Sequence, residues 1–368
     1  MAPLQRNSRE SREGFSVNLR HRPKLKAARS LPVRSMARPP TLSTFSIVAY
    51  DAERKSWGVA VQSKFISVGA VVPWGEANVG ALATQAHANV RYGPEGLALL
   101  RKGVSGPEVV RKLIEADGGR DHRQLGVVDA RGRAAAHTGS KCLEWAGHEV
   151  GEGFTCQGNI LFASAVVHGM ARAFEATPGD LPERLFAALS AGQREGGDRR
   201  GMQSAAMLIV REHGGYDDGN DRWVDIRVDD HPSPIEEMRR VFELYDLTML
   251  TREDPATLVT VTPEVAGVVQ HHLSVLGYYH GRLNSKWDEP TQSAYDKFLN
   301  ESNFESKARA DQKIWPSVLN FLQGRAAAEV ERRTRTAPAV SGALSKGPGA
   351  QGGKGSSPRT PPKGRSNG

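Results

Sequence analysis

The chain has 368 residues, a formal net charge of +8 and two cysteines. Its basic residues concentrate at the ends, because residues 1–43 hold ten lysines and arginines against two acids, and residues 325–368 hold nine against two. Residues 44–324 carry 30 basic and 37 acidic residues, so their net charge is −7. This balance gives no support to a nucleic-acid site on the folded part, although the basic tails could still contact polyanions.

Cys142 and Cys156 are too few for a disulfide scaffold and lack the spacing of a metal site, so reduced structural thiols are expected. No apolar run reaches the length of a membrane span. The composition therefore excludes a disulfide-rich secreted domain and a helical membrane protein.

The N-terminal segment, residues 1–43, is rich in arginine and serine and poor in acids. This composition predicts a disordered basic leader. It also fits an organelle-targeting leader, or a start codon placed too far upstream with Met36 as the alternative start. The segment lacks the apolar core of a secretory signal, so we expect a cytoplasmic protein.

The central part of the chain is dense in predicted strands. Thr44 opens the first of them, in a hairpin whose turn lies near Arg54. Residues 73–76 are predicted as the turn of the second hairpin. The predicted strands are 44–51, 57–64, 66–72, 79–86, 124–129, 134–138, 153–160, 204–210 and 222–228.

Helices are predicted from apolar spacing, early prolines and acids in the first turn. Their ranges are 93–100, 105–114, 164–176, 181–194, 235–245, 262–279 and 291–299. Strands and pairs of helices come in separate groups within 44–248, which predicts an α+β layered sheet fold. Residues 255–323 are expected to form a small helical module. Residues 325–368 turn to Gly/Ser/Pro/Lys low complexity and are predicted to be a disordered basic tail.

Thr44 could act as a nucleophile in a way that an internal threonine cannot. If the leader is absent or removed, Thr44 carries a free α-amine that can serve as the general base of its own hydroxyl. Lys64 or Asp198 could tune that amine, although spacing alone does not place either beside it. The alternative is an ordinary strand threonine, because threonine is common in strands.

Polar side chains at or just beyond strand ends form the candidate substrate site. They could orient a carbonyl substrate, or they could simply terminate strands; they are Gln62, Ser63, Gln85 and Asn89. Gly158 and Asn159 could supply a backbone N–H and a carboxamide to an oxyanion hole. Their alternative is a tight turn satisfied by the asparagine.

The loop that begins at Asp198 is the most charged one beside an apolar strand. Arg199 or Arg200 could hold a substrate carboxylate bidentately, with Ser204 nearby. The alternative is an internal ion pair between Asp198 and an arginine.

Motifs for metals and nucleotides are absent from the sequence. The run 217–221 fails the register of a calcium loop and lacks its closing glutamate. There is no phosphate-binding P-loop and no dinucleotide-binding glycine pattern. We therefore predict no cofactor and no metal site.

Ordered short motifs give the central region a family resemblance. They are Thr44-Phe-Ser-Ile-Val-Ala, Gly58-Val-Ala-Val-Gln-Ser-Lys64, Val72-Pro-Trp74, Ala83-Thr-Gln85, Tyr92-Gly-Pro94, Gln124-Leu-Gly-Val-Val-Asp129, Ala136-His-Thr-Gly139, Gln157-Gly-Asn159, Gly197-Asp-Arg-Arg-Gly201 and Asp229-Asp-His231. Together they resemble the family called domain of unknown function 1028, which is grouped with the Ntn hydrolases. The resemblance covers about 44–248. It implies a four-layer αββα sandwich with the nucleophile at the N-terminus of a central strand.

Family members often begin Met-Thr at this point, whereas 43 residues precede Thr44 here. Either the leader is trimmed, the start is misplaced, or this copy lacks the free amine. Residues 269–283 and 295–298 are similar to a peptidoglycan-binding helical module, except that Asn284-Ser-Lys-Trp-Asp288 stands where such modules have a Gly-rich turn.

These observations predict an Ntn-type amidohydrolase that uses Thr44 on a small amide-type substrate. The alternative is a non-catalytic binding protein, in which the sandwich is a scaffold and residues 255–323 dock on cell-wall glycan or another partner. A homo-oligomer fits either function, and no membrane partner is expected.

Overall fold

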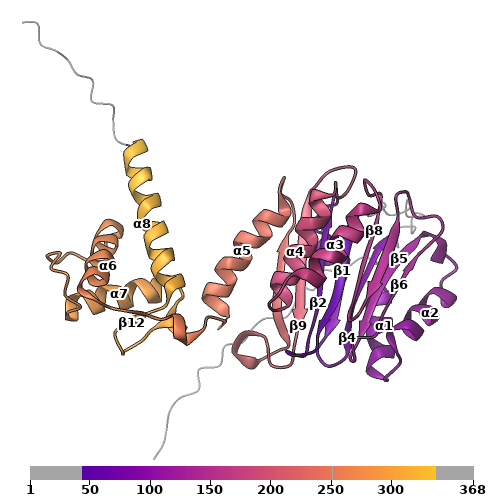
Figure 1. Ribbon diagram of the computed structural model, residues 1–368, viewed down its shortest axis with the longest axis horizontal. Helices are drawn as coiled ribbons and strands as arrows, with labels where there is room; N and C mark the ends of the chain where they lie inside the picture. The colour runs from indigo at the N-terminus through magenta and orange to yellow at the C-terminus, as the bar shows by residue number, and fades with distance from the viewer. Residues whose placement is uncertain (1–43, 251, 337–368) are drawn as a thin grey trace, which may run out of the picture. The chain divides into compact units, whose positions relative to one another are not determined.

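The computed structural model describes residues 44–250 and 252–336 (Figure 1). The chain divides into two compact units, one ending at Met238 and the other beginning at Arg239. The predicted leader 1–43 lies outside the described residues, as does the part of the predicted tail that follows residue 336.

Within residues 44–250, one antiparallel sheet has six strands in the order β10-β9-β2-β1-β8-β7. Its strands are β1 (Thr44–Asp51), β2 (Ser56–Ser63), β7 (Gly147–Gly151), β8 (Phe154–Asn159), β9 (Ser204–Val210) and β10 (Arg222–Val228). The first strand therefore lies in the middle of the sheet, between β2 and β8.

A second antiparallel sheet of the same unit has four strands in the order β3-β4-β5-β6 among the described residues. They are β3 (Pro73–Glu76), β4 (Gly80–Ala86), β5 (Arg123–Asp129) and β6 (Ala134–Thr138). The two sheets contact each other through β1, β2 and β8 on one side and β3, β4 and β5 on the other. Apolar side chains such as Val48, Val59 and Leu208 fill part of the space between them.

Helices cover the outer face of each sheet (Figure 1). Helices α1 (Tyr92–Arg101) and α2 (Gly106–Ala116) pack on the four-stranded sheet, and α3 (Ala165–Ala176) and α4 (Leu181–Arg194) pack on the six-stranded sheet. Ser105 caps α2 by accepting the N–H of Glu108. The first unit is thus a mixed α/β structure with helices on both outer faces.

The second unit is mainly helical. It contains α6 (Pro263–Leu276), α7 (Glu289–Glu301), α8 (Pro316–Thr336) and the short strands β11 (Val259–Thr260) and β12 (Lys313–Ile314). Helix α5 (Pro234–Met249) crosses the boundary between the two units. The core of the second unit is aromatic and aliphatic, with Tyr295, Phe298, Phe304 and Leu322 among its buried side chains.

Most predicted elements are confirmed, and three are wrong. Residues 66–72 form no strand; they contain a short 3₁₀ turn at Val68–Ala70, and the predicted turn 73–76 is strand β3. The physical reason is that the Ser204 hydroxyl accepts the N–H of Val68 at 3.1 Å, and Ser67 lies in the left-handed region with φ +53°. Strand β7 was not predicted.

The third difference is helix α8, which was not predicted; because it continues to residue 336, the predicted disordered tail is wrong for residues 325–336. Its buried side chains Val318, Leu322 and Ala326 recur every four residues, which places them on one face of the helix.

The described residues contain neither a helix that could cross a membrane nor a cluster that could hold a metal ion. None of their helices combines the length and apolarity that crossing a membrane requires. The same residues contain no group of three histidine, cysteine, aspartate or glutamate side chains arranged to hold a metal ion.

Candidate functional site

Thr44 is the first residue of the central strand β1 and is fully buried. It pairs with Ser63 on β2 and with Asn159 on β8. The hydroxyls of Thr44 and Ser63 lie 3.2 Å apart. Two predicted catalytic residues, Thr44 and Asn159, and one predicted substrate-binding residue, Ser63, therefore lie side by side at the same end of three neighbouring strands.

The pleat of the strands decides which polar side chains share a face with Thr44. Ser46 lies two residues further along β1 and therefore shares a face with Thr44. Its Oγ donates to Gln85 Oε1 at 2.6 Å, and because Gln85 belongs to β4, this face of the six-stranded sheet packs against the four-stranded sheet. Phe45 points to the opposite face, since a Cβ on Gly192 of α4 would lie 3.3 Å from its ring.

Gln62 pairs with Phe45, so it lies on the face covered by α4 and is separated from the Thr44 hydroxyl by the sheet. It is fully buried, and neither atom of its amide group has a hydrogen-bond partner in the part of the chain that the structure describes. The structure thus separates Gln62 from Ser63, which the sequence grouped together.

Gln124, at the second position of β5, connects the polar groups around Thr44. Its Oε1 accepts the Nδ2–H of Asn159 at 3.0 Å and the Nε2–H of Gln85 at 2.8 Å. Its Nε2 has two N–H groups, which are shared among three acceptors: Gly158 O at 2.7 Å, Thr138 Oγ1 at 2.9 Å and Gly147 O at 3.1 Å. Gln124 is fully buried. It therefore fixes the Asn159 amide beside Thr44.

Gln85 links the same network to the backbone of Thr44. Its Nε2 lies 3.4 Å from Thr44 O, in addition to its shorter bond to Gln124. Ser46 Oγ also accepts the Nε2–H of Gln157 at 2.6 Å. The amides of Gln85, Gln124 and Gln157 thus form one buried hydrogen-bonded group between the two sheets, where unpaired amides would be costly.

A histidine lies at the outer end of this network. His148 Nδ1 lies 2.8 Å from Thr138 Oγ1, which also accepts from Gln124. Burial, and then the charge of His137, lowers the pKa of His148 below its ordinary value. A neutral His148 can accept the Thr138 hydroxyl proton, a polarity that is compatible with the bond that Thr138 accepts from Gln124.

Gly158 lies inside strand β8, not in a tight turn. It pairs with Phe45 on β1 and with Gly147 on β7. A Cβ at this position would lie 2.4 Å from the Leu161 side chain, so a larger residue would require that side chain to move. Its neighbour Asn159 points toward Gln124, as described above.

The Asp198 loop is held by its own ion pair and by the end of β2. Asp198 is buried, accepts the backbone N–H of Lys64 at 2.9 Å and pairs with Arg200 Nη2 at 3.3 Å. Arg199 Nη2 donates to Leu161 O at 3.3 Å. The Lys64 ammonium donates to Met202 O at 3.2 Å. The internal ion pair offered as the alternative for this loop is therefore present.

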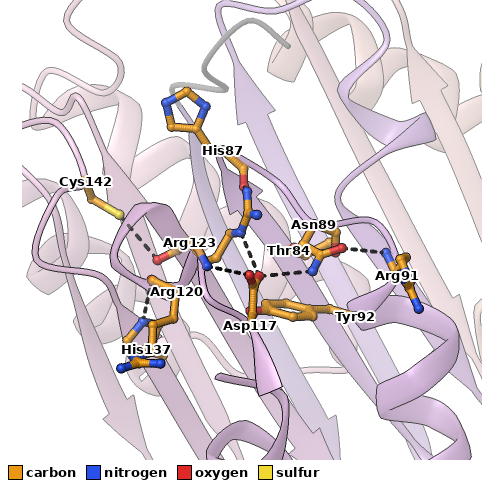
Figure 2. Close-up of polar contacts among 11 residues, drawn as sticks. Thr84, His87, Asn89, Arg91, Tyr92, Asp117, Arg120, Arg123, His137 and Cys142 are labelled. Atoms are coloured by element: carbon orange, nitrogen blue, oxygen red, sulfur yellow. Dashed lines mark hydrogen bonds and ion pairs between the residues drawn. The ribbon is translucent and has the colours of Figure 1, made fainter. Parts of the chain in front are cut away.

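Two further predicted residues have structural partners elsewhere. Ser204 Oγ holds the segment after β2 through Val68 N–H and Phe65 O. Asn89 lies in a separate polar cluster, where its Nδ2 donates to Asp117 Oδ2 at 3.1 Å (Figure 2). No contact within the described structure joins Asn89 to Thr44.

Sequence reasoning did not identify Gln124, Thr138 or His148 as site residues. Gln124 and Thr138 lie in the motifs Gln124-Leu-Gly-Val-Val-Asp129 and Ala136-His-Thr-Gly139, which were interpreted only as the two strands of a hairpin. The signal that could have identified them is a polar side chain at one end of each strand, at Gln124 and Thr138, which pair with each other across β5 and β6.

Comparisons with known proteins agree with the fold and with the motifs. A crystal structure of protein SPO2555 from Silicibacter pomeroyi, described as a DUF1028 protein, is 34% identical to this chain with a TM-score of 0.52. The similarity covers 57% of this chain and 88% of that one. No curated protein matched.

Two family models match different parts of the chain. Residues 248–322 match a model described as "Putative peptidoglycan binding domain". Residues 44–238 match the model described as "Family of unknown function (DUF1028)". The region that contains Thr44, Gln124 and Asn159 is therefore a DUF1028 domain, and the chain belongs to the DUF1028 family.

Proposed function

We propose that the first unit is an Ntn-type amidohydrolase in which Thr44, as the first residue of the mature chain, attacks an amide carbonyl. The observation that carries this proposal is the place of Thr44, which begins the central strand and directs its hydroxyl into the polar group between the sheets. The order helices, sheet, sheet, helices in this unit supports an αββα sandwich of the Ntn type.

The proposal requires hydrolysis of the peptide bond between Ser43 and Thr44. Water supplies the hydroxyl of the released carboxyl group and one proton of the new α-amine. That amine can then accept the Thr44 hydroxyl proton as the oxygen attacks the substrate carbonyl. The leaving amine takes the proton, an acyl-enzyme forms, and a second water releases the acid.

The surrounding side chains have distinct roles in this scheme. Ser63 Oγ lies within 3.2 Å of the attacking oxygen and can hold it in position. Asn159 provides an amide whose orientation is fixed by Gln124, so it meets the oxyanion without reorganising. Asp198 acts indirectly: it accepts the backbone N–H of Lys64, the residue directly after Ser63, and so holds the end of β2 in place.

The mass and N-terminal sequence of the protein purified from its own host would test the proposal. We expect a chain that begins at Thr44 and hydrolyses members of a panel of small amides. Thr44→Val keeps the side-chain shape and should abolish that hydrolysis. The matched control Thr177→Val removes a hydroxyl that only bonds Ala173 O at the end of α3, so activity should persist. An active protein with intact residues before Thr44 would refute the mechanism.

We also propose that the second unit binds cell-wall glycan, since residues 248–322 match the peptidoglycan-binding model. A hollow of about 660 Å³ lies along α7 and is lined by Gln292, Asp296, Asn300 and Arg309, among others. Gln292 is positioned by the Trp287 indole at 2.6 Å and donates to Asp296 at 2.7 Å. Amides and carboxylates in a fixed row suit sugar hydroxyls, which both donate and accept.

A pull-down on purified peptidoglycan tests this binding. Asn300→Ala and Gln292→Ala should each reduce the bound fraction, whereas Glu331→Ala on the exposed part of α8 should not. Equal binding by all variants would count against the hollow. Cell fractionation would show whether the protein occupies the cytoplasm, as the sequence predicts, or reaches the compartment of its glycan.

A further inference from the structure

A second polar site lies between the end of β4, the start of α1 and the start of β5. A hollow of about 550 Å³ is present there, lined by His87, Ala88, Asn89, Val90, Arg91, Gly119, His122 and Arg123. Its titratable lining residues are two arginines and two histidines, with no acid among the described residues that line it. The hollow is therefore rich in hydrogen-bond donors.

Arg123 is held rigidly at the edge of this hollow (Figure 2). Its Nε donates to Asp117 Oδ2 at 2.9 Å and its Nη1 to His87 O at 2.5 Å. Its Nη2 donates to no residue that the structure describes, and it lies against Gly119, where a Cβ would approach it to 2.7 Å. The glycine leaves this edge of the guanidinium open toward the hollow.

Asp117 is the anchor of Arg123 and is itself saturated. Its Oδ2 accepts from Arg123, from the Tyr92 hydroxyl at 2.8 Å and from Asn89 Nδ2 at 3.1 Å, and its Oδ1 accepts the N–H of Gly119 at 2.7 Å. Burial alone would raise the pKa of Asp117, but these bonds, led by Arg123, place it well below its usual range. Asp117 has therefore no capacity left for a ligand and serves to orient the guanidinium.

The two histidines add donors beside this edge. The rings of His87 and His122 are 5.4 Å apart and nearly perpendicular, at 88°. The backbone N–H of His87 donates to His122 O at 3.1 Å, which fixes the two residues together. A neutral imidazole supplies one N–H. The hollow thus offers the guanidinium edge of Arg123, with the His122 ring beside it.

The balance of charges at the site favours a monoanion over a dianion. Asp117 neutralises Arg123, and Glu95 pairs with the exposed Arg91 at 3.1 Å. The site therefore has no excess charge to hold a phosphate dianion, whereas an open guanidinium edge suits one carboxylate through charge-assisted bonds.

The hollow begins at the end of β4 that contacts Thr44. Gln85, which reaches Thr44 O, precedes His87 by two residues, a separation of about 7 Å in extended chain. Ala86 has φ +63°, which turns the chain out of the sheet at this point. A ligand in the hollow could therefore extend around this strand end toward the polar group between the sheets.

We propose that the hollow binds a carboxylate of the substrate, and that the substrate class is amides that carry a carboxylate a few bonds from the scissile carbonyl. The substrate assignment rests on the proposed amidohydrolase function. Carboxylate binding itself does not, because it can be measured without turnover. Arg123 binds the ligand, and Asp117 positions Arg123.

Calorimetry on the full chain carrying Thr44→Val tests binding without hydrolysis. The paired probes are N-acetylglycine and N-acetylglycinamide, which differ only in the carboxylate. We expect the acid to bind about tenfold more tightly than the amide, since a hydrogen bond to a charged group contributes that much. The ring signals of His87 and His122 should shift in nuclear magnetic resonance spectra during the same titration.

Arg123→Gln should remove the preference for the acid. His122→Phe keeps the Arg123–Asp117 pair and should reduce the preference, so it gives the answer if Arg123→Gln fails to fold. Arg131→Gln is the control, since Arg131 is exposed and does not line the hollow. Equal binding of both probes, or an acid preference without ring shifts, would overturn the proposal. Acid-selective binding with unchanged turnover in Thr44→Val would instead overturn only the proposed nucleophile.

Discussion

Removing the side-chain amide of Gln124 should destabilise the first unit more than any other single loss of a polar group around Thr44. Gln124→Leu has nearly the same volume but deletes two accepted hydrogen bonds and the two N–H groups that three acceptors share. Asn159 Nδ2, Gly158 O and Gln85 Nε2 lose their shortest partner. Each buried group left unsatisfied costs about 1–3 kcal/mol.

The expected total is at the lower end of that sum. Gln85 Nε2 keeps longer contacts to Thr44 O and Gln157 O, both at 3.4 Å, so its loss is partial. We therefore expect a fall of about 3–5 kcal/mol in the free energy of unfolding. That is a large share of the roughly 5–15 kcal/mol of a typical domain. In a unit of this size it lowers Tm by about 6–20 °C.

Urea unfolding of the full chain measures the change, and hydrogen exchange with mass spectrometry locates it. Peptides from β1, β5 and β8 should lose protection, while peptides from α6 to α8 serve as the internal reference. The matched control is Gln203→Leu, because Gln203 is half-buried and its side chain makes one exposed hydrogen bond, to Asp230 at 3.1 Å. A Gln124→Leu change below about 1 kcal/mol, or no larger than the control, would refute the central role of Gln124.

Three further outcomes concern His148, the two cysteines and the Glu253–Lys307 pair. The pKa of His148 is lower in the folded protein than in the unfolded chain, so the unfolded chain binds the proton at a higher pH than the folded protein does. The free energy of unfolding therefore falls as pH drops below about 6.5. His148→Asn should flatten this part of a Tm-against-pH curve. Burial raises the pKa of Cys156 well above its ordinary value, so thiol titration of the native protein should leave Cys156 unmodified and modify the half-buried Cys142 first. Glu253→Ala leaves the buried ammonium of Lys307 without its carboxylate at 2.7 Å, which should cost the second unit about 3 kcal/mol in urea unfolding, whereas Lys307→Met should cost less.

The hairpin of β1 and β2 was predictable because alternation and a polar turn are local signals. Residues 66–72 have equally apolar spacing, yet they do not form a strand. The Ser204 hydroxyl, far along the chain, accepts a hydrogen bond from the N–H of Val68, and Asp229 O accepts one from the N–H of Ser67. A partner more than a hundred residues away redirects this backbone, and no local pattern announces it.

Helix α8 shows the opposite case, in which a local signal was present but outweighed by composition. The Arg/Ala-rich run after Gly324 reads as the start of a low-complexity tail. Val318, Leu322 and Ala326 nevertheless lie four residues apart and are buried in the aromatic core of the second unit. Alanine and arginine are also strong helix formers, so the run continues the helix to residue 336.

In the candidate site, too, some features follow from local sequence patterns and others depend on residues distant in the chain. Once the β1–β2 hairpin is accepted, its turn fixes the register, and the pleat then places Ser63 beside Thr44 and Gln62 on the other face. That separation could have been derived from the sequence. The role of Gln124 could not, because it depends on how closely β5 packs against β1 and β8. A predicted strand says which way a side chain points along its own sheet, whereas the partner that it meets is set by the packing of two sheets. Sequence patterns therefore miss the residues that the facing sheet contributes to such a site, and Gln124 is one of them.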